Sequence, residues 1–245
     1  MILNIAAYHF VHVESPETLA TWVRERAEAL SLRGTVLVAG EGINVFLAGD
    51  ESAIHDFLAD LRTDERFANI VVKFSRSSTQ PFARMKVKVK PEIISFRRDG
   101  ASPLGQRAPA IEPSTLARWL QQGHDDTGKR VVMLDTRNAQ EVEYGTFAGA
   151  LTLPIAKFTD LPQALAPHRD TLADATVVSF CTGGIRCEKA ALWMREDGMD
   201  NVLQLDGGIL GYFEHVGANG YDGHCFVFDD RVALDPQLQP LVDPA

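Results

Sequence analysis

Two periods of apolar residues alternate along the first hundred positions of the chain. Stretches with every second residue apolar are typical of β-strands, and stretches with apolar residues three or four positions apart are typical of α-helices. This reading predicts a β-α-β-β-α-β order, which fits an α+β domain of the ferredoxin-like (split βαβ) type, with an antiparallel sheet and both helices on one face. The expected strands are 4–12, 34–39, 43–47 and 70–74, and the expected helices are 16–30 and 51–61.

From position 114 onward, strands and helices are expected to alternate one by one. This alternation predicts an α/β domain with a parallel sheet and helices on both faces. The expected helices are 114–122, a polar helix near 139–144, one around Pro162, and 188–196; the expected strands are 131–134, 150–153, 175–180 and 201–205.

The stretch between these two regions has three prolines and no sustained period, which is typical of a linker. The predicted organisation is therefore a ferredoxin-like domain, a linker, an α/β domain, and a C-terminal strand with a tail. Their predicted limits are 1–98, 99–113, 114–217 and 218–245.

The strongest chemical signal lies between the strand 175–180 and the helix that follows it. The sequence there is Cys181-Thr182-Gly183-Gly184-Ile185-Arg186. At a turn from strand to helix, backbone N–H groups converge on the cysteine sulfur and the helix dipole favours negative charge. The two glycines permit the positive φ values that such a cradle requires, and the arginine is expected to place its charge at the rim. These features favour a nucleophilic thiolate, against the alternative of a buried structural cysteine.

Three more residues of this domain, Asp135, Arg137 and Cys187, are candidate site residues. Asp135 and Arg137 follow a predicted strand, where such side chains brace a neighbouring loop more often than they react. Cys187 is either a resolving or relay thiol or a small residue packed under the loop. A Cys181–Cys187 disulfide is expected to be awkward, because adjacent residues on a helix point about 100° apart. Cys225 is expected to be a buried strand residue.

The net charge of −9 conceals a basic segment in the first domain. Residues 68–98 carry a net charge of +7, which leaves −16 for the remainder, so a localised anionic partner is expected. The basic residues predicted to contact an RNA backbone are Lys73, Arg76, Arg84, Lys86, Lys88 and Lys90. The last four alternate with apolar residues, so as a strand they form one cationic face. The alternative is a solvated face that protects a sheet edge.

Three other residues of the first domain have two interpretations each. Phe82 either stacks on a base of a single-stranded loop or packs beside Pro81. Glu41 and Asn44 lie at a glycine turn, where they either read a base or serve the turn itself.

Composition excludes several classes of function. The sequence contains no run of about twenty apolar residues, which a membrane-spanning helix would need. Its N-terminal apolar residues are not preceded by the basic segment of a secretory signal. Three cysteines are too few for a disulfide scaffold and fit a reducing cytoplasm. The sequence has no flavin, nicotinamide or metal motif, and it indicates no obligate protein partner.

Four short motifs are spread along the α/β domain: 134–137 (Leu-Asp-Thr-Arg), 149–154 (Gly-Ala, then Leu-Pro), 181–186 and 205–209 (Leu-Asp-Gly-Gly-Ile). In these motifs the domain resembles a rhodanese domain. Four residues separate Cys181 from Arg186, as in the persulfide-carrying loop of rhodaneses, whereas the related protein phosphatases have five. The shorter loop suits a sulfur-sized group, so phosphatase activity is not expected.

A second set of motifs extends over nearly the whole chain: 40–44, Lys73, Ser75, 81–82, 87–88, 135–138, 141–142, 145–147, 181–189 and 225–231. In these segments the chain resembles the tRNA uridine(34) hydroxylase family, whose members contain a rhodanese domain. The resemblance implies oxygen-dependent conversion of the wobble uridine to 5-hydroxyuridine, with Cys181 as the active cysteine and the tRNA anticodon arm as partner. Longer members carry a cysteine-rich C-terminal extension, and this chain stops at Ala245 like the short form.

Two other functions stay open from the residues alone. A sulfurtransferase would carry a persulfide on Cys181, and a non-catalytic module would only bind RNA. For the hydroxylase, molecular oxygen is a substrate and the electron donor is unknown. The sulfur could add to C6 of the base, carry oxygen, or carry another sulfur.

Overall fold

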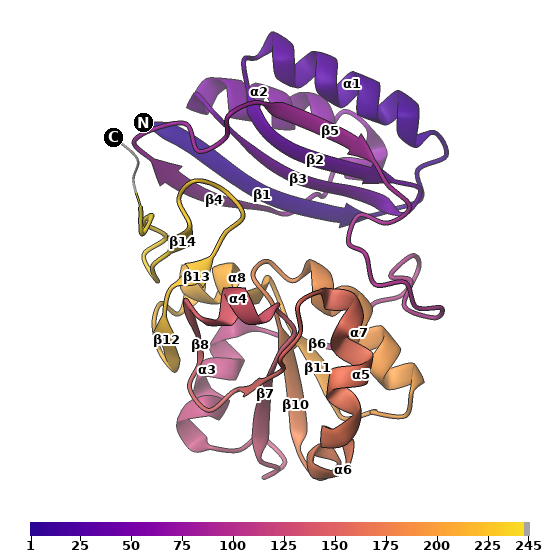
Figure 1. Cartoon of the computed structure of the whole chain (residues 1–245), viewed down its shortest axis with the longest axis vertical. Coiled ribbons are helices and arrows are strands. Elements are labelled where there is room, and N and C mark those ends of the chain that lie inside the picture. The colour runs from indigo at the N-terminus through magenta and orange to yellow at the C-terminus, as the bar shows by residue number, and fades with distance from the viewer. Residues whose placement is uncertain (243–245) are drawn as a thin grey trace. The chain divides into compact units, whose positions relative to one another are not determined.

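The computed structural model describes residues 1–242 and divides into two compact units, each with its own sheet (Figure 1). Unit 1 comprises Met1–Ser95, the short segment Phe228–Val232 and the described residues from Gln239 on. Unit 2 comprises Phe96–Val227 and Ala233–Leu238. The predicted pair of folds is confirmed, an α+β unit followed by an α/β unit with a parallel sheet. Among the described residues, none of the helices has both the length and the apolar character needed to cross a membrane.

Unit 1 has the predicted β-α-β-β-α-β order and then adds one more strand. Alternate residues of the three central strands, among them Val36, Val45 and Ile5, are buried in one core with apolar residues of both helices. The elements are β1 (Ile2–Phe10), α1 (Pro16–Ala29), β2 (Arg33–Ala39), β3 (Gly42–Gly49), α2 (Glu51–Leu61), the 3-10 helix η1 (Glu65–Phe67), β4 (Val72–Ser77) and β5 (Met85–Val89).

The sheet of unit 1 has the order β4-β1-β3-β2-β5, so β4 and β5 form opposite edges. All neighbours are antiparallel except β2 and β5, which run parallel, unlike the predicted all-antiparallel sheet. The physical reason is the path of the chain. Because β4 ends at the end of the sheet where β2 begins, a short connection along that end brings β5 in beside β2 in the same direction.

Unit 2 is built on a five-stranded parallel sheet of order β6-β11-β10-β7-β9. Two short antiparallel pairs, β8 with β12 and β13 with β14, complete its strands. The strands are β6 (Ala110–Ile111), β7 (Val131–Asp135), β8 (Gly145–Phe147), β9 (Leu151–Thr152), β10 (Thr176–Phe180), β11 (Val202–Leu205), β12 (Tyr221–Gly223), β13 (Cys225–Phe226) and β14 (Ala233–Leu234). The helices are α3 (Pro113–Gln122), α4 (Ala139–Val142), η2 (Phe158–Asp160), α5 (Leu161–Leu165), η3 (Ala166–His168), α6 (Arg169–Leu172), α7 (Ile185–Glu196) and α8 (Gly208–His215).

Helices cover both faces of this sheet, as predicted. Val178 and Phe180 of β10 pack in one core with residues of α3 and α8. Ser179 lies between them, and its hydroxyl contacts Cys187 of α7. Successive strand residues point to opposite faces, so α7 covers the face away from α3 and α8.

The predicted linker 99–113 differs from the structure at its carboxyl end. Ala110–Ile111 forms β6, which pairs with β11, and α3 already begins at Pro113. A two-residue strand has no period to detect, and its partner lies about ninety positions away. Phe96, placed by sequence in the first domain, belongs to unit 2, where its ring stacks on Phe158 at 4.5 Å.

The predicted C-terminal strand and tail contain more structure than expected. The segment 218–242 supplies β12, β13 and β14, while Phe228–Val232 belongs to unit 1. The last three residues of the predicted tail, 243–245, lie outside the described part of the chain.

Candidate functional site

The Cys181 loop is held by backbone hydrogen bonds on two sides. Gly184 adopts φ +102° as the N-cap of α7, and its N–H donates to Cys181 Sγ at 3.2 Å. Behind the loop, the Ile209 N–H donates to the Cys181 carbonyl at 2.9 Å. Gly208 permits this approach, because a Cβ atom there would lie 2.5 Å from the same carbonyl oxygen. The expected cradle is therefore present, but Gly183 does not have the positive φ value that the sequence suggested.

The surroundings of Cys181 favour its thiolate. The side chain is buried, which by itself disfavours charge. A hydrogen bond from Cys187, the charge of Arg186 and backbone N–H groups outweigh burial and lower the pKa of Cys181 to about 6. At neutral pH the sulfur is then mostly ionised and nucleophilic.

Cys187 is the neutral partner of this thiolate. Burial and the hydrogen bond to Cys181 raise the pKa of Cys187 well above its usual value. Its sulfur also lies 3.6 Å from the hydroxyl of Thr136, at the end of β7. Because α7 begins at Ile185, three residues earlier than predicted, Cys187 lies in the first turn of the helix.

Arg186 is buried and paired, and it does not lie at the rim of the loop. Its two terminal nitrogens donate to the carboxylate oxygens of Glu141 at 2.6 and 2.7 Å. Both side chains are almost completely buried, with exposed fractions of 7% and 0%. The predicted role of stabilising the Cys181 anion fits this position, whereas the guanidinium nitrogens that could hold a phosphate already bind a carboxylate.

Sequence reasoning did not assign Glu141 to the site. Glu141 receives the N–H of Asn138 at 3.1 Å at the start of α4, and the Thr182 hydroxyl lies 3.5 Å from its other oxygen. One carboxylate therefore joins the α4 N-terminus, the Cys181 loop and Arg186. The available signal was the Asn-x-x-Glu spacing of a helix start, which indicates a helix start but no site.

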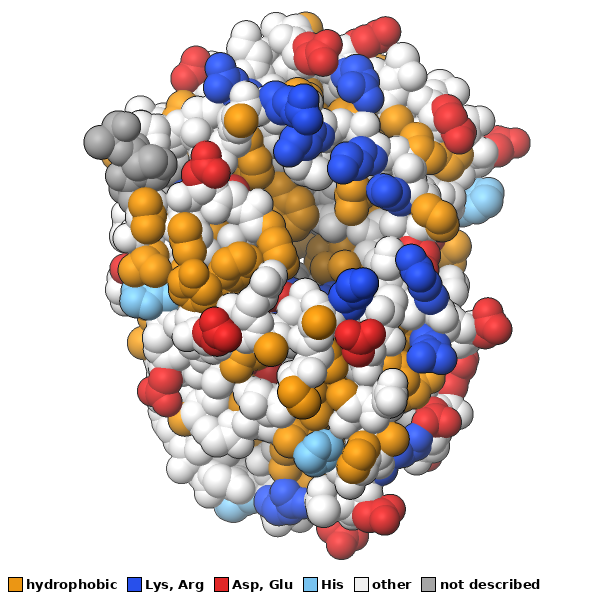
Figure 2. Space-filling model, in the orientation of Figure 1, with side chains coloured by type: hydrophobic (Ala, Val, Ile, Leu, Met, Phe, Trp, Pro, Cys, Tyr) orange, Lys and Arg blue, Asp and Glu red, His pale blue; other side chains and the backbone are white. Residues whose placement is uncertain are grey.

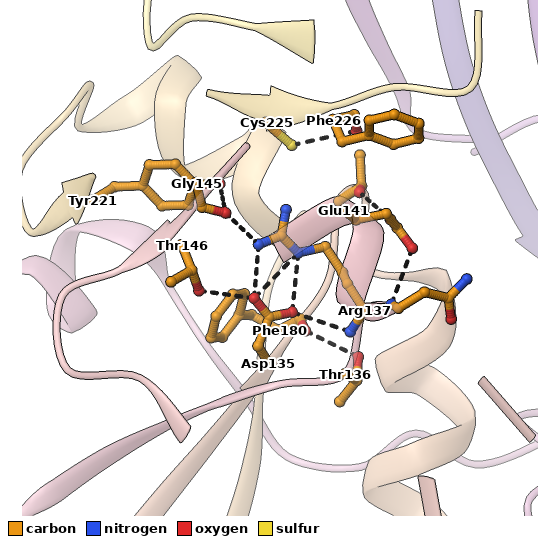
Figure 3. Close-up of polar contacts among 12 residues, drawn as sticks. Asp135, Thr136, Arg137, Glu141, Gly145, Thr146, Phe180, Tyr221, Cys225 and Phe226 are labelled. Atoms are coloured by element: carbon orange, nitrogen blue, oxygen red, sulfur yellow. Dashed lines mark hydrogen bonds and ion pairs between the residues drawn. The ribbon is translucent and has the colours of Figure 1, made fainter. Parts of the chain in front are cut away.

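Asp135 and Arg137 form a second buried pair beside the loop (Figure 3). The Arg137 guanidinium binds both carboxylate oxygens of Asp135 and donates to the Gly145 carbonyl at 2.6 Å. Thr146 donates its hydroxyl to Asp135 at 2.8 Å. These contacts fasten the end of β7 to β8, which is the geometry of a bracing role.

Cys225 differs from the other two cysteines. It lies on β13 and is completely buried, and burial raises its pKa to about 12. Figure 3 draws it above the Arg137 guanidinium, and its sulfur makes a long contact of 3.9 Å with the Phe226 carbonyl. It is thus a neutral strand residue.

The predicted RNA-contacting residues fall on two edges of the sheet of unit 1. Lys73 and Arg76 lie on β4, and Arg76 is paired with Glu51 at 3.0 and 2.9 Å. Arg84, Lys86, Lys88 and Lys90 lie on or beside β5 at the opposite edge, and all four are exposed.

Arg24 of α1, which sequence reasoning missed, adds a cation to this second group, because its guanidinium donates to the Val87 carbonyl of β5 at 2.9 Å. Lys and Arg side chains gather along the course of β5 (Figure 2). We call Arg24, Arg84, Lys86, Lys88 and Lys90 the β5 surface.

Glu41 and Asn44 hold the chain that follows β5. Glu41 accepts the Ile93 N–H at 2.8 Å, and Asn44 donates to the Ile93 carbonyl at 3.3 Å. These contacts favour the structural interpretation of both residues over base reading. Phe82 is half-buried, and its N–H donates to the Gln80 side chain.

Each of the two units matches a known family. Residues 2–93 match the family model of the UPF0176 acylphosphatase like domain, and residues 116–215 match that of the rhodanese-like domain. A tRNA uridine(34) hydroxylase from Xanthomonas campestris is 69% identical over 245 residues, covering 100% of this chain and 97% of that protein. The chain belongs to the tRNA uridine(34) hydroxylase family. The predicted resemblance is confirmed.

Other members of the tRNA uridine(34) hydroxylase family match over the same length. The protein of that name from Xylella fastidiosa is 66% identical, and the match covers 99% of this chain and 95% of the Xylella protein. One from Xanthomonas euvesicatoria is 69% identical, with coverages of 99% and 98%. Both units, and not the rhodanese-like domain alone, therefore define the membership of this chain in the tRNA uridine(34) hydroxylase family.

Proposed function

We propose that this protein hydroxylates uridine 34 of tRNA to 5-hydroxyuridine with molecular oxygen, and that Cys181 is its nucleophile. The observation that carries the proposal is the Cys181 sulfur in its backbone cradle, where it accepts the Gly184 N–H at 3.2 Å, in a chain that matches tRNA uridine(34) hydroxylases over its whole length. A small-molecule sulfurtransferase would use the same cradle, but it has no need of the β5 surface.

The chemistry assigned to Cys181 follows from the electronic structure of uracil. C6 is electrophilic because it is conjugated with the C4 carbonyl, and a thiolate that adds there makes C5 electron-rich. C5 then bonds to O₂, and two electrons and two protons from a donor reduce the resulting peroxide, which leaves a hydroxyl on C5 and releases the other oxygen atom as water. Elimination of the Cys181 sulfur from C6, with loss of the C5 proton, restores the ring as 5-hydroxyuridine. A thiolate at neutral pH meets the first requirement of this route.

The β5 surface is assigned to the phosphates of the anticodon arm. Its five cations are carried by one strand edge and one adjoining helix residue, so they form a row that can follow a nucleic-acid backbone. Such contacts provide affinity and little sequence selectivity. The base of residue 34 must leave its stack to reach a cysteine, which an anticodon loop permits at low cost.

The test is the amount of 5-hydroxyuridine at position 34 in tRNA from a deletion strain. The strain is complemented with the wild-type chain, with Cys181→Ser, or with Cys225→Ser as the matched control of a buried cysteine. Wild type and Cys225→Ser are expected to restore the modification, and Cys181→Ser is not. Full restoration of 5-hydroxyuridine by Cys181→Ser would show that Cys181 is not the nucleophile. Transfer of sulfur from thiosulfate to cyanide by the protein, with no effect of the deletion on 5-hydroxyuridine in tRNA, would favour the sulfurtransferase.

A further inference from the structure

We propose that Cys181 and Cys187 act as a dithiol that supplies the two electrons required for oxygen-dependent hydroxylation of uridine. In this proposal Cys187 is a catalytic residue, and an external thiol reductant returns the pair to the dithiol after each turnover. The inference rests on the proposed function and names the electron donor that it requires.

The two sulfurs are already in contact. The Gly184 peptide unit binds both residues, because its N–H donates to the Cys181 sulfur at 3.2 Å and its carbonyl accepts the Cys187 N–H at 3.0 Å. The Cys187 thiol is the hydrogen-bonding side chain of the Cys181 sulfur, and both side chains are completely buried. Cys181 lies in the loop and not on the helix, so the angular separation of adjacent helical residues does not apply to the pair. The left-handed turn at Gly184 directs the chain back, and this brings the first turn of α7 under the Cys181 sulfur. The expectation of an awkward disulfide is therefore replaced by a preformed sulfur pair.

The electron balance of the reaction calls for such a pair. Conversion of a C–H group to C–OH by O₂, with the second oxygen atom leaving as water, needs two electrons and two protons from a donor. Two thiols that become a disulfide release two electrons and two protons. The overall reaction is uridine + O₂ + two thiols → 5-hydroxyuridine + H₂O + disulfide.

The steps assign a distinct role to each sulfur. After Cys181 adds to C6, O₂ bonds to C5, and protonation gives a hydroperoxide there. The Cys187 sulfur takes the outer oxygen, which leaves a hydroxyl on C5 and a sulfenic acid on Cys187. Elimination releases Cys181 from C6, and its thiolate attacks the Cys187 sulfur. The S–S bond forms, and the oxygen leaves as water.

The electrostatics of the pair fit this order of events. In the resting protein, the hydrogen bond and the negative charge of Cys181 hold Cys187 in its thiol form. Once Cys181 is bonded to carbon, both of these influences end, while the buried charge of Arg186 remains. Cys187 thus becomes a better nucleophile only after the base has been attacked. The other neighbours of its sulfur are the hydroxyls of Thr136 and Ser179, which carry no charge.

The experiment is a single turnover of the full chain without reductant. The protein is reduced, freed of reductant under nitrogen, and mixed with tRNA and air-saturated buffer. The 5-hydroxyuridine formed per protein and the cysteine pairing are then measured by mass spectrometry. The expected result is about one 5-hydroxyuridine per protein with a Cys181–Cys187 disulfide, and many turnovers when a dithiol reductant is added.

Variants separate the dithiol from a purely structural contact. Cys225→Ser is expected to match wild type. Cys187→Ser keeps a hydrogen-bond donor for Cys181 but is expected to reduce the reductant-free product at least tenfold, while its thiolate absorbance at neutral pH stays that of one ionised cysteine. One equivalent of product from Cys187→Ser without reductant would overturn the proposal.

The wild-type measurement decides the case even where the variant does not fold. Product that appears only with added reductant, with no disulfide in the protein, would overturn the dithiol and leave the hydroxylase intact. Absence of 5-hydroxyuridine under every condition would overturn both proposals.

Discussion

Replacing Glu141 by glutamine perturbs the buried ion pair that supports the Cys181 loop. The carboxylate faces both terminal nitrogens of Arg186 at 2.6 and 2.7 Å, and neither side chain reaches solvent to any useful extent. Glutamine keeps the shape and one acceptor oxygen but leaves the Arg186 charge unpaired. Breaking one partner of a buried pair costs about 3–5 kcal/mol of folding free energy. Coulomb's law gives a similar value, about 4 kcal/mol at 4 Å with an effective dielectric constant of 20.

The same substitution should act on Cys181 in the opposite sense. Without the Glu141 charge, Arg186 favours the thiolate more strongly, so the pKa of Cys181 is expected to fall or stay the same and not to rise. Stability is measured from hydrogen exchange of the α7 amides in urea, and ionisation from thiolate absorbance. Glu143→Gln, at an exposed neighbouring position, is the matched control and should change stability by less than about 0.5 kcal/mol. A loss below about 1 kcal/mol for Glu141→Gln, or a raised pKa of Cys181, would refute this account of the pair.

Three further predictions concern the thiolate, the loop and the β5 surface. Because the pKa of Cys181 is lowered from 9.0 to about 6 on folding, thiolate absorbance should titrate near pH 6, and the stability it contributes should be lost as pH falls from about 9 to 6. Gly208→Ala should destabilise unit 2 by about 1–3 kcal/mol or more and lower the activity. The reason is that residue 208 has φ +62° and that the new Cβ would lie 2.5 Å from the Cys181 carbonyl oxygen. Lys86→Ala with Lys88→Ala should weaken tRNA binding and reduce the slope of log K against log salt by roughly 1.4–1.8.

Two of these three predictions have a control variant in the chain. Gly105 has φ +80° with open space around its Cβ position, so Gly105→Ala isolates backbone strain from the close approach at Gly208. Arg76 is already paired with Glu51, so Arg76→Ala should alter the salt slope less than either β5 lysine. Equal effects of Arg76→Ala and the lysine variants would contradict the assignment of the β5 surface. Titration of the Cys181 thiol near pH 9 would contradict the claim that the cradle stabilises its thiolate.

Local sequence patterns were sufficient for the two folds and for the position of Cys181. Apolar periodicity locates most strands and helices, because each element buries one face whatever its partners are. The strand–cysteine–glycine–helix order likewise places Cys181 at a helix start. The pattern Met85-Lys86-Val87-Lys88-Val89 predicts an exposed cationic strand face, and the structure contains it at a sheet edge.

Contacts between distant positions were decided only by the tertiary structure. Glu141 meets Arg186 across 45 positions, and β6 exists only because β11 accepts it. The division of the basic residues between two sheet edges depends on strand order, which no local pattern contains.

The contact between the sulfurs of Cys181 and Cys187 has the same origin. It depends on where α7 begins and on the turn at Gly184. Residue types and their local spacing thus determine which chemical groups this protein has and on which elements they lie. Which groups meet is determined by the packing of elements far apart in the chain, because burial and pairing energies depend on neighbours that folding alone brings together.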